Sequence, residues 1–174
     1  MYYDNQEIKP FIGIGDIKIG ETYENIVSIL KSHKIIYSMG IDPNKGCTPQ
    51  VEWKTIYIKN YMNLVFAEDV LFQINFDIDF KGSLNNGIKI NTKMTEALKI
   101  DKTLEYDDWD ELWQSEEGYW LLDTVESGKV YMFSIGIKEM FNDDEFYSYE
   151  WLKKYKTIKK WWYCFIGDIS NVLW

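Results

Sequence analysis

The sequence predicts an α+β protein. Two tandem units, each a helix followed by a β-hairpin, form a mostly antiparallel sheet, and a further helix lies near the carboxyl end. Three observations support this fold class. The pattern Ile17-Lys18-Ile19, placed before a helical segment, recurs 71 positions later as Ile88-Lys89-Ile90. Apolar and polar residues alternate after each copy, as in strands with one buried face. A stretch rich in Gly and Asn, residues 82–87, separates the copies.

The first unit is predicted to span about residues 11–80. Its helix follows Thr22, whose hydroxyl is suited to cap a helix amino terminus, and apolar residues recur at helical spacing as Tyr23, Ile26, Val27 and Leu30. Three strands are expected after it, around residues 53–58, 62–66 and 71–78. In the third strand Ile74 and Phe76 alternate with Gln73 and Asn75, which indicates one buried face and one wet face.

The second unit is predicted to span about residues 84–138. It has a shorter helix over residues 92–100 and a hairpin that pairs 119–124 with 130–137. The remaining segment, 139–174, is predicted to hold a basic helix over 151–160 and an apolar aromatic stretch over 161–166. A chain of 174 residues matches the usual size of one domain, so we expect residues 1–174 to form a single domain.

Composition indicates a cytoplasmic protein that does not enter a membrane. The chain is 46% hydrophobic and 17% aromatic, which excludes a disordered polypeptide. Residues 1–10 are polar and unlike a signal peptide, and no apolar run approaches the ~20 residues that span a bilayer. The two cysteines, Cys47 and Cys164, lie far apart and form no disulfide framework, as expected in a reducing cytosol.

The negative charge is concentrated in one part of the chain. The formal net charge is −9, and residues 101–150 alone carry fifteen acidic residues against three lysines. All 19 basic residues are lysine, so no guanidinium group is present for bidentate recognition of phosphate or guanine. We therefore expect no direct contact with nucleic acid and a basic protein as the partner.

Residues 106–120 hold six of these fifteen acids and also three tryptophans. Helical spacing would place Trp109, Leu112 and Trp113 on one side, so we predict a short amphipathic helix here. Trp is a frequent anchor at interface centres, and acids speed the association of a basic partner. The candidate partner-binding residues are Asp107, Asp108, Trp109, Asp110, Glu111, Trp113, Glu116 and Glu117. The alternative is that the tryptophans pack in the core and the acids are solvated or pair with lysines of residues 153–160.

No catalytic motif, metal site or cofactor site is predicted. One histidine and two distant cysteines do not make a zinc site of the usual kind. The only enzymatic chemistry that the residues readily allow is hydrolysis by paired carboxylates, so a carboxylate-dependent hydrolase acting on a saccharide is the alternative to a noncatalytic binding protein. A scaffold with no fixed ligand is a third interpretation.

The pattern Ile17-Lys18-Ile19-Gly20-x-Thr22-x-x-x-Ile26-Val27, followed by strands and then repeated, resembles the tandem units of the beta-lactamase inhibitory protein and of related small outer-membrane assembly lipoproteins. No lipoprotein-type cysteine stands near Met1. In general character the chain is similar to immunity proteins of contact-dependent and other polymorphic toxin systems of bacteria, which are small, acidic and rich in aromatic residues. These resemblances imply a noncatalytic immunity protein or inhibitor that binds and occludes a basic toxin, by expectation a nuclease. The oligomeric state stays open.

Overall fold

A computed structural model describes residues 2–42 and 51–156. The chain divides into two compact units, Met1–Lys138 and Glu139–Trp174. The first unit contains a large antiparallel sheet, a small second sheet and two α-helices. The predicted α+β fold class is therefore confirmed.

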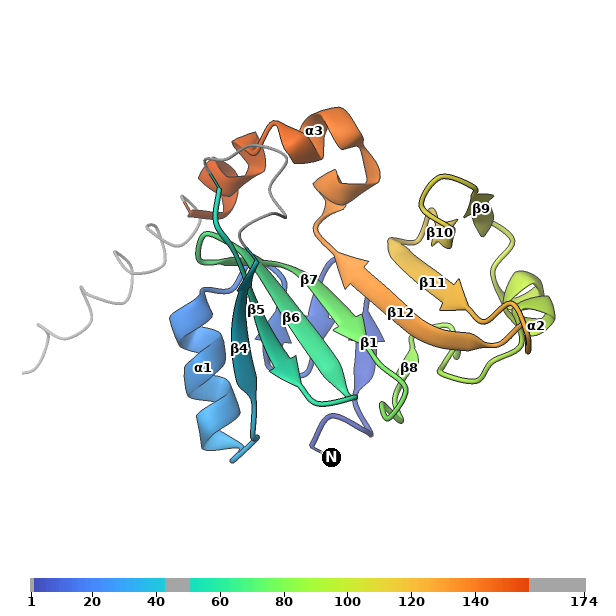
Figure 1. Ribbon diagram of the computed structural model, residues 1–174, viewed down its shortest axis with the longest axis horizontal. Helices are drawn as coiled ribbons and strands as arrows, with labels where there is room; N and C mark the ends of the chain where they lie inside the picture. The colour runs from blue at the N-terminus through green and yellow to red at the C-terminus, as the bar shows by residue number, and fades with distance from the viewer. Residues whose placement is uncertain (1, 43–50, 157–174) are drawn as a thin grey trace, which may run out of the picture. The chain divides into compact units, whose positions relative to one another are not determined.

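The large sheet has eight strands in the order β4-β5-β6-β7-β12-β11-β10-β9, and every neighbouring pair is antiparallel (Figure 1). Helix α1 (Tyr23–Ser32) precedes β4 (Ser38–Asp42), β5 (Trp53–Ile58), β6 (Met62–Ala67) and β7 (Val70–Phe76). Helix α2 (Met94–Ile100) precedes β9 (Glu105–Asp107), β10 (Leu112–Ser115), β11 (Tyr119–Asp123) and β12 (Val130–Gly136). Each helix thus leads into four strands, whereas the sequence analysis expected three strands after the first helix and one hairpin after the second.

The small sheet has the order β3-β2-β1-β8 and lies behind the large sheet in Figure 1. Its strands are β1 (Glu7–Lys9), β2 (Gly13–Ile14), β3 (Ile17–Lys18) and β8 (Ser83–Leu84), and β1 pairs with β8 in parallel. One cluster of buried apolar side chains joins this sheet to both helices and to one face of the large sheet. Its members include Ile8, Ile17, Ile26, Leu30, Ile74, Phe76, Met94, Ala97, Leu121 and Phe133.

The first helix forms as its sequence predicts. The Thr22 hydroxyl accepts a hydrogen bond from the backbone N–H of Asn25 at 3.3 Å, and Ile26 and Leu30 are fully buried. In β7, Ile74 and Phe76 are buried and Gln73 and Asn75 are partly exposed, but the strand ends at Phe76.

Corresponding backbone hydrogen bonds occur in the two halves of the first unit. Each half ties the start of its helix to its last strand, and the second set lies 71 positions later before the helix and 59 later in the strand. In the first half the bonds run from Gly20 N to Leu71 O, from Leu71 N to Glu21 O and from Tyr23 N to Asp69 O. In the second half the corresponding bonds run from Asn91 N to Val130 O, from Val130 N to Thr92 O and from Met94 N to Gly128 O. They support the predicted pseudo-repeats 11–80 and 84–138, which stay a prediction.

The second unit begins in the 3-10 helix η1 (Lys138–Phe141) and continues through α3 (Asp143–Tyr147). A further helix covers residues 150–156, which confirms the predicted carboxyl-terminal helix for that range. The Trp151 indole stacks on the Phe146 ring at 5.9 Å and donates a hydrogen bond to the Phe146 carbonyl at 2.9 Å. Residues 157–160 of the predicted helix and the stretch 161–166 lie outside the described residues.

Candidate functional site

The acidic segment forms a hairpin at the last edge of the large sheet. Strands β9 and β10 pair antiparallel, with Tyr106 opposite Trp113 and Glu105 opposite Gln114, and residues 108–111 make the turn. We call residues 105–117 the acidic hairpin. The predicted helix over this segment is wrong. Helix propensity is a weak preference, and here Trp113 gains a cross-strand neighbour on each side, Tyr106 in β9 and Leu121 in β11.

The turn of the acidic hairpin is held by Asp107. One carboxylate oxygen, Oδ1, accepts hydrogen bonds from the backbone N–H groups of Trp109 at 2.8 Å and of Asp110 at 3.2 Å. This is the local side-chain to backbone bonding that lets an Asp specify a turn. Glu111, the last residue of the turn, has a left-handed backbone conformation with a φ of 54°. Asp107 therefore positions the tip of the hairpin, a structural role that the sequence did not reveal.

The two candidate tryptophans of the hairpin have different environments. The Trp109 side chain, in the turn, is 92% exposed. Trp113, on β10, is half-buried against the core cluster, and its ring centre lies 5.1 Å from that of Tyr106. Its indole Nε1 donates to the Asp123 carboxylate at 3.1 Å. Trp109 is thus open to solvent, whereas Trp113 fixes the hairpin to the sheet.

A buried carboxylate anchors the base of the acidic hairpin. Asp101, at the carboxyl end of α2, is 4% exposed. It accepts hydrogen bonds from the hydroxyls of Ser115 and Tyr119, both at 2.5 Å, and from the N–H and hydroxyl of Thr103, both at 2.8 Å. Burial alone would raise the pKa of Asp101, but these hydrogen bonds outweigh burial and hold that pKa below its usual value. Burial and the bond to Asp101 raise the pKa of Tyr119.

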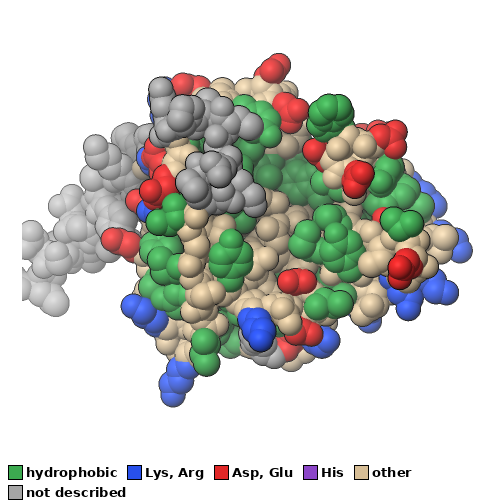
Figure 2. Space-filling model, in the orientation of Figure 1, with side chains coloured by type: hydrophobic (Ala, Val, Ile, Leu, Met, Phe, Trp, Pro, Cys, Tyr) green, Lys and Arg blue, Asp and Glu red, His purple; other side chains and the backbone are tan. Residues whose placement is uncertain are grey.

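Most carboxylates of the acidic hairpin are exposed and have no cation beside them. Within the described residues no lysine or histidine lies in ion-pair distance of Asp108, Asp110, Glu111 or Glu116. Glu117 only accepts a long bond from the Asn86 amide at 3.5 Å. The described lysines Lys153 and Lys154, expected as possible partners, pair with Glu150 and Glu139 of their own unit. Figure 2 shows acidic side chains gathered over this end of the sheet.

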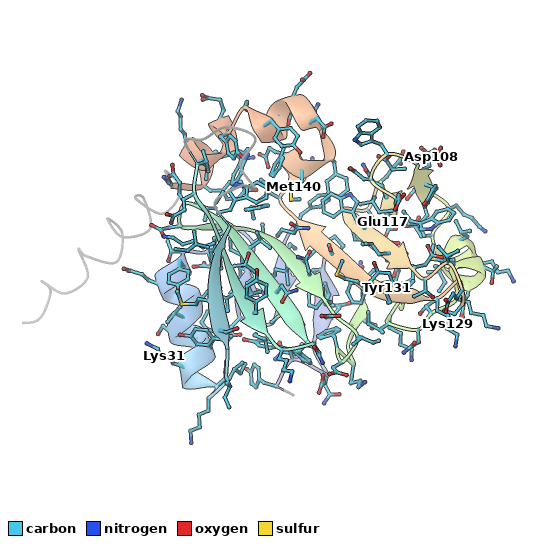
Figure 3. All side chains as sticks on the ribbon, viewed as in Figure 1. Lys31, Asp108, Glu117, Lys129, Tyr131 and Met140 are labelled. Atoms are coloured by element: carbon cyan, nitrogen blue, oxygen red, sulfur yellow. The ribbon has the colours of Figure 1, made fainter. Side chains whose placement is uncertain are left out.

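A shallow groove of about 370 Å³ runs along one side of the acidic hairpin. Three of the predicted residues, Asp107, Asp108 and Glu116, line it. The others lie elsewhere: Trp109, Asp110 and Glu111 in the turn, Trp113 against the core, and Glu117 in the turn after β10 (Figure 3 labels Asp108 and Glu117). The sequence missed the lining residues Thr103, Glu105, Tyr106 and Gln114.

The geometry of the hairpin fits binding better than carboxylate catalysis. A glycosidase needs two carboxyl groups in a cleft, with the pKa of the acid raised by burial. The buried carboxylate here is Asp101, and its hydrogen bonds lower its pKa. The groove acids Glu105, Asp108 and Glu116 are exposed. Across residues 2–42 and 51–156 no three His, Cys, Asp or Glu side chains gather as metal ligands would.

Comparison of the chain with protein-family models, with curated proteins and with solved structures gives no match. Among the described helices, none has both the length and the apolar character needed to cross a membrane.

Proposed function

We propose that this protein is a noncatalytic immunity protein or inhibitor that binds a basic bacterial toxin through its acidic hairpin and covers the toxin's substrate site. A nuclease is the toxin class that fits best, because carboxylates can take the place of substrate phosphates. A single observation carries the proposal. A tryptophan that is 92% exposed stands at the tip of a hairpin whose neighbouring carboxylates have no cation partner in the described part of the chain.

The hairpin is also organised before any partner arrives. Asp107 fixes the turn that carries Trp109, and Asp101 fixes the base of the hairpin to α2 and β11. Ordering a loop upon binding costs free energy, so a preformed hairpin binds more tightly than a flexible one with the same side chains. The exposed acids would speed the encounter, and Trp109 would supply the apolar contact.

The experiment is a capture of partners from the native cell lysate with the tagged full chain at low and high salt. The test variant is Asp108→Lys with Asp110→Lys, two exposed acids whose side chains make no hydrogen bond to any other described residue. The matched control is Asp79→Lys with Glu126→Lys, which makes the same charge change at exposed positions outside the hairpin.

We expect wild type and control to retain one stoichiometric basic protein that salt releases, and the test variant to lose it. The captured protein's toxic activity should be blocked by wild type and by control. Equal capture by all three chains, or capture without inhibition, would remove the acidic hairpin from the model. Replacing Trp109 with Ala should raise the dissociation rate more than it lowers the association rate, because the side chain acts after encounter.

The second candidate is a carboxylate-dependent hydrolase acting on a saccharide. The observation that favours it is the groove, in which Tyr106 lies beside Glu105, Asp108 and Glu116, since sugars stack on aromatic rings. This candidate predicts glycan hydrolysis by the wild-type chain that Glu105→Gln or Glu116→Gln abolishes. An inhibitor would show no hydrolysis and would bind its toxin through either variant with only a modest loss.

A further inference from the structure

The edge of the large sheet opposite the acidic hairpin carries exposed apolar residues. This edge is β4, which pairs only with β5 in the described sheet. Met39 is 57% exposed and Ile41 is 63% exposed, and Ile36, just before the strand, is 91% exposed. Residues 35–41 contain no charged side chain and no proline. The unpaired backbone groups of β4 are therefore flanked by apolar side chains.

Such an edge is unusual in a protein that stays alone. Sheet edges offer unpaired N–H and C=O groups to any other strand, and natural proteins protect them with lysine, proline, bulges or very short strands. β4 has no lysine, proline or bulge among its five residues, which pair with β5 in one continuous register, and its one charged residue is Asp42 at its last position. The other edge strand, β9, has only three residues, and two of them, Glu105 and Asp107, are charged. The β4 edge is therefore longer and less charged than the β9 edge.

We propose that β4 pairs antiparallel with β4 of a second copy of this chain, so that the two large sheets become one continuous sheet across a two-fold axis at Gly40. Adding a strand to an exposed edge is an established mode of recognition in which backbone hydrogen bonds supply the affinity. A two-fold axis places the same surface on both sides of the contact.

The register about Gly40 matches apolar side chains to apolar side chains. It sets Met39 opposite Ile41 of the partner subunit, and cross-strand pairs of this kind stabilise sheets. Gly40 is suited to the axis because it has no side chain, and the Tyr57 ring lies over it, so that a Cβ there would come within 3.0 Å of the ring. Tyr57 is 42% exposed, and in the dimer it would flank the axis on the other face.

The distribution of charge favours pairing of β4 with β4 of a second copy over pairing that involves β9. Residues 101–150, which include β9, hold fifteen of the 28 acids, while residues 1–50, which include β4, are nearly neutral, with six acids and five lysines. β4 and β9 end the eight-strand sheet, roughly 34 Å apart at about 4.8 Å per strand. In a β4 dimer the two acidic hairpins point away from each other by several Debye lengths, which are ~10 Å in 0.1 M salt. Pairing through β9 would instead bury or oppose carboxylates. This dimer goes beyond the proposed function and leaves both acidic hairpins free.

The oligomeric state of the full chain tests the proposal. Sedimentation velocity across a concentration series should show a dimer for wild type. Met39→Lys with Ile41→Lys should raise the dimer dissociation constant roughly 100-fold or more, because four like charges would face one another across the axis. The matched control, Ile12→Lys with Ile78→Lys, changes isoleucines that are 51% and 52% exposed and should leave the dimer intact.

Urea unfolding of each variant separates loss of the dimer from loss of the fold, since all four positions are exposed. A wild-type chain that sediments as a monomer at every concentration would overturn the proposal. A Met39→Lys, Ile41→Lys chain that dimerises as tightly as the control would overturn it as well.

Chemical cross-linking tests the register. In a background with Cys47 and Cys164 replaced by Ser, we would mix one chain carrying Met39→Cys with another carrying Ile41→Cys and add a short thiol cross-linker. If the mixed chains form a cross-linked heterodimer faster than either variant alone forms a cross-linked homodimer, pairing about Gly40 is supported. A dimer that cross-links no faster than chains carrying Ile78→Cys would exclude that register.

Discussion

The two edge strands of the large sheet differ in charge, in length and in what holds them. β9 is short and acidic, and the hairpin that it forms with β10 is tied to the rest of the unit by the buried Asp101 and by Trp113. β4 is longer and uncharged over residues 38–41, and it is held by its pairing with β5 and by the Tyr23 hydroxyl of α1, which donates to the Met39 sulfur at 2.6 Å. The short acidic edge is thus held by buried side-chain contacts in addition to its three backbone pairs, whereas the longer β4 has a ladder of five pairs.

The largest expected effect is the loss of the Asp101 anchor. Asp101→Ala would leave the hydroxyls of Ser115 and Tyr119 without their acceptor in a buried site, so we expect the free energy of unfolding to fall by about 3 kcal/mol or more. Asp108→Ala, at an exposed position, should change it by less than about 0.5 kcal/mol. Urea unfolding measures both values. Equal effects would mean that the acidic edge needs no anchor.

Of the two hairpin tryptophans, the half-buried one should contribute more to the free energy of unfolding than the exposed one. Trp113→Ala removes a half-buried ring from the core cluster together with its bond to Asp123, and we expect a loss of about 2–3 kcal/mol in the free energy of unfolding. Trp109→Ala should cost under about 0.5 kcal/mol, because the side chain is 92% exposed. Thermal or urea unfolding decides the matter. A large cost at Trp109 would place that side chain in a structural role and weaken the proposed interface.

The anchor also gives the acidic edge a pH dependence. The pKa of Asp101 is lowered in the folded chain from 3.8, so the folded state binds this proton less readily than the unfolded state does. The stability from this group is therefore present above about pH 4 and is lost as the pH falls through the folded pKa. Asp101→Asn should remove this part of the acid-induced loss, which urea unfolding between neutral and acidic pH would reveal. Parallel pH profiles for the two chains would contradict the assignment.

The smallest effect concerns the turn. Asp107→Ala removes the acceptor for the N–H groups of Trp109 and Asp110 and should cost about 1 kcal/mol of the free energy of unfolding. Asp107→Asn keeps a side-chain oxygen at that position and should restore most of the loss. Asp110→Ala, at an exposed position in the same turn, serves as the control and should have little effect. A variant series in which all three chains are equally stable would show that the turn does not depend on Asp107.

The elements that the sequence predicted well are those whose local pattern agrees with their tertiary environment. Thr22 caps α1, Ile26 and Leu30 form its buried stripe, and β7 alternates as expected up to Phe76. The prediction of a helix in the acidic segment failed because the spacing of its apolar residues fits both a helix and a hairpin. Trp109 and Trp113 are four residues apart, as on one helix face, yet Trp113 gains more from Tyr106 and Leu121 across strands than a lone short helix provides.

The candidate site was predicted in composition but not in geometry. The position of the acids along the chain is visible in the sequence, and so is the presence of tryptophan. The separate roles of Trp109 and Trp113, the turn-forming role of Asp107 and the anchor at Asp101 depend on neighbours from α2 and β11 that only the folded chain brings together.

The hydrogen bonds that tie each helix start to the last strand of its own half bear on how the chain folds. Joining Glu21 to Leu71 closes a loop of about 50 residues, and joining Thr92 to Val130 closes one of about 38. Loop-closure entropy grows only as the logarithm of length, so the two closures differ by roughly 0.2 kcal/mol. Loop length therefore favours neither half as the folding nucleus. The packing within each half then determines which half folds first. The first half, with the longer and fully paired strands β5, β6 and β7, holds that advantage.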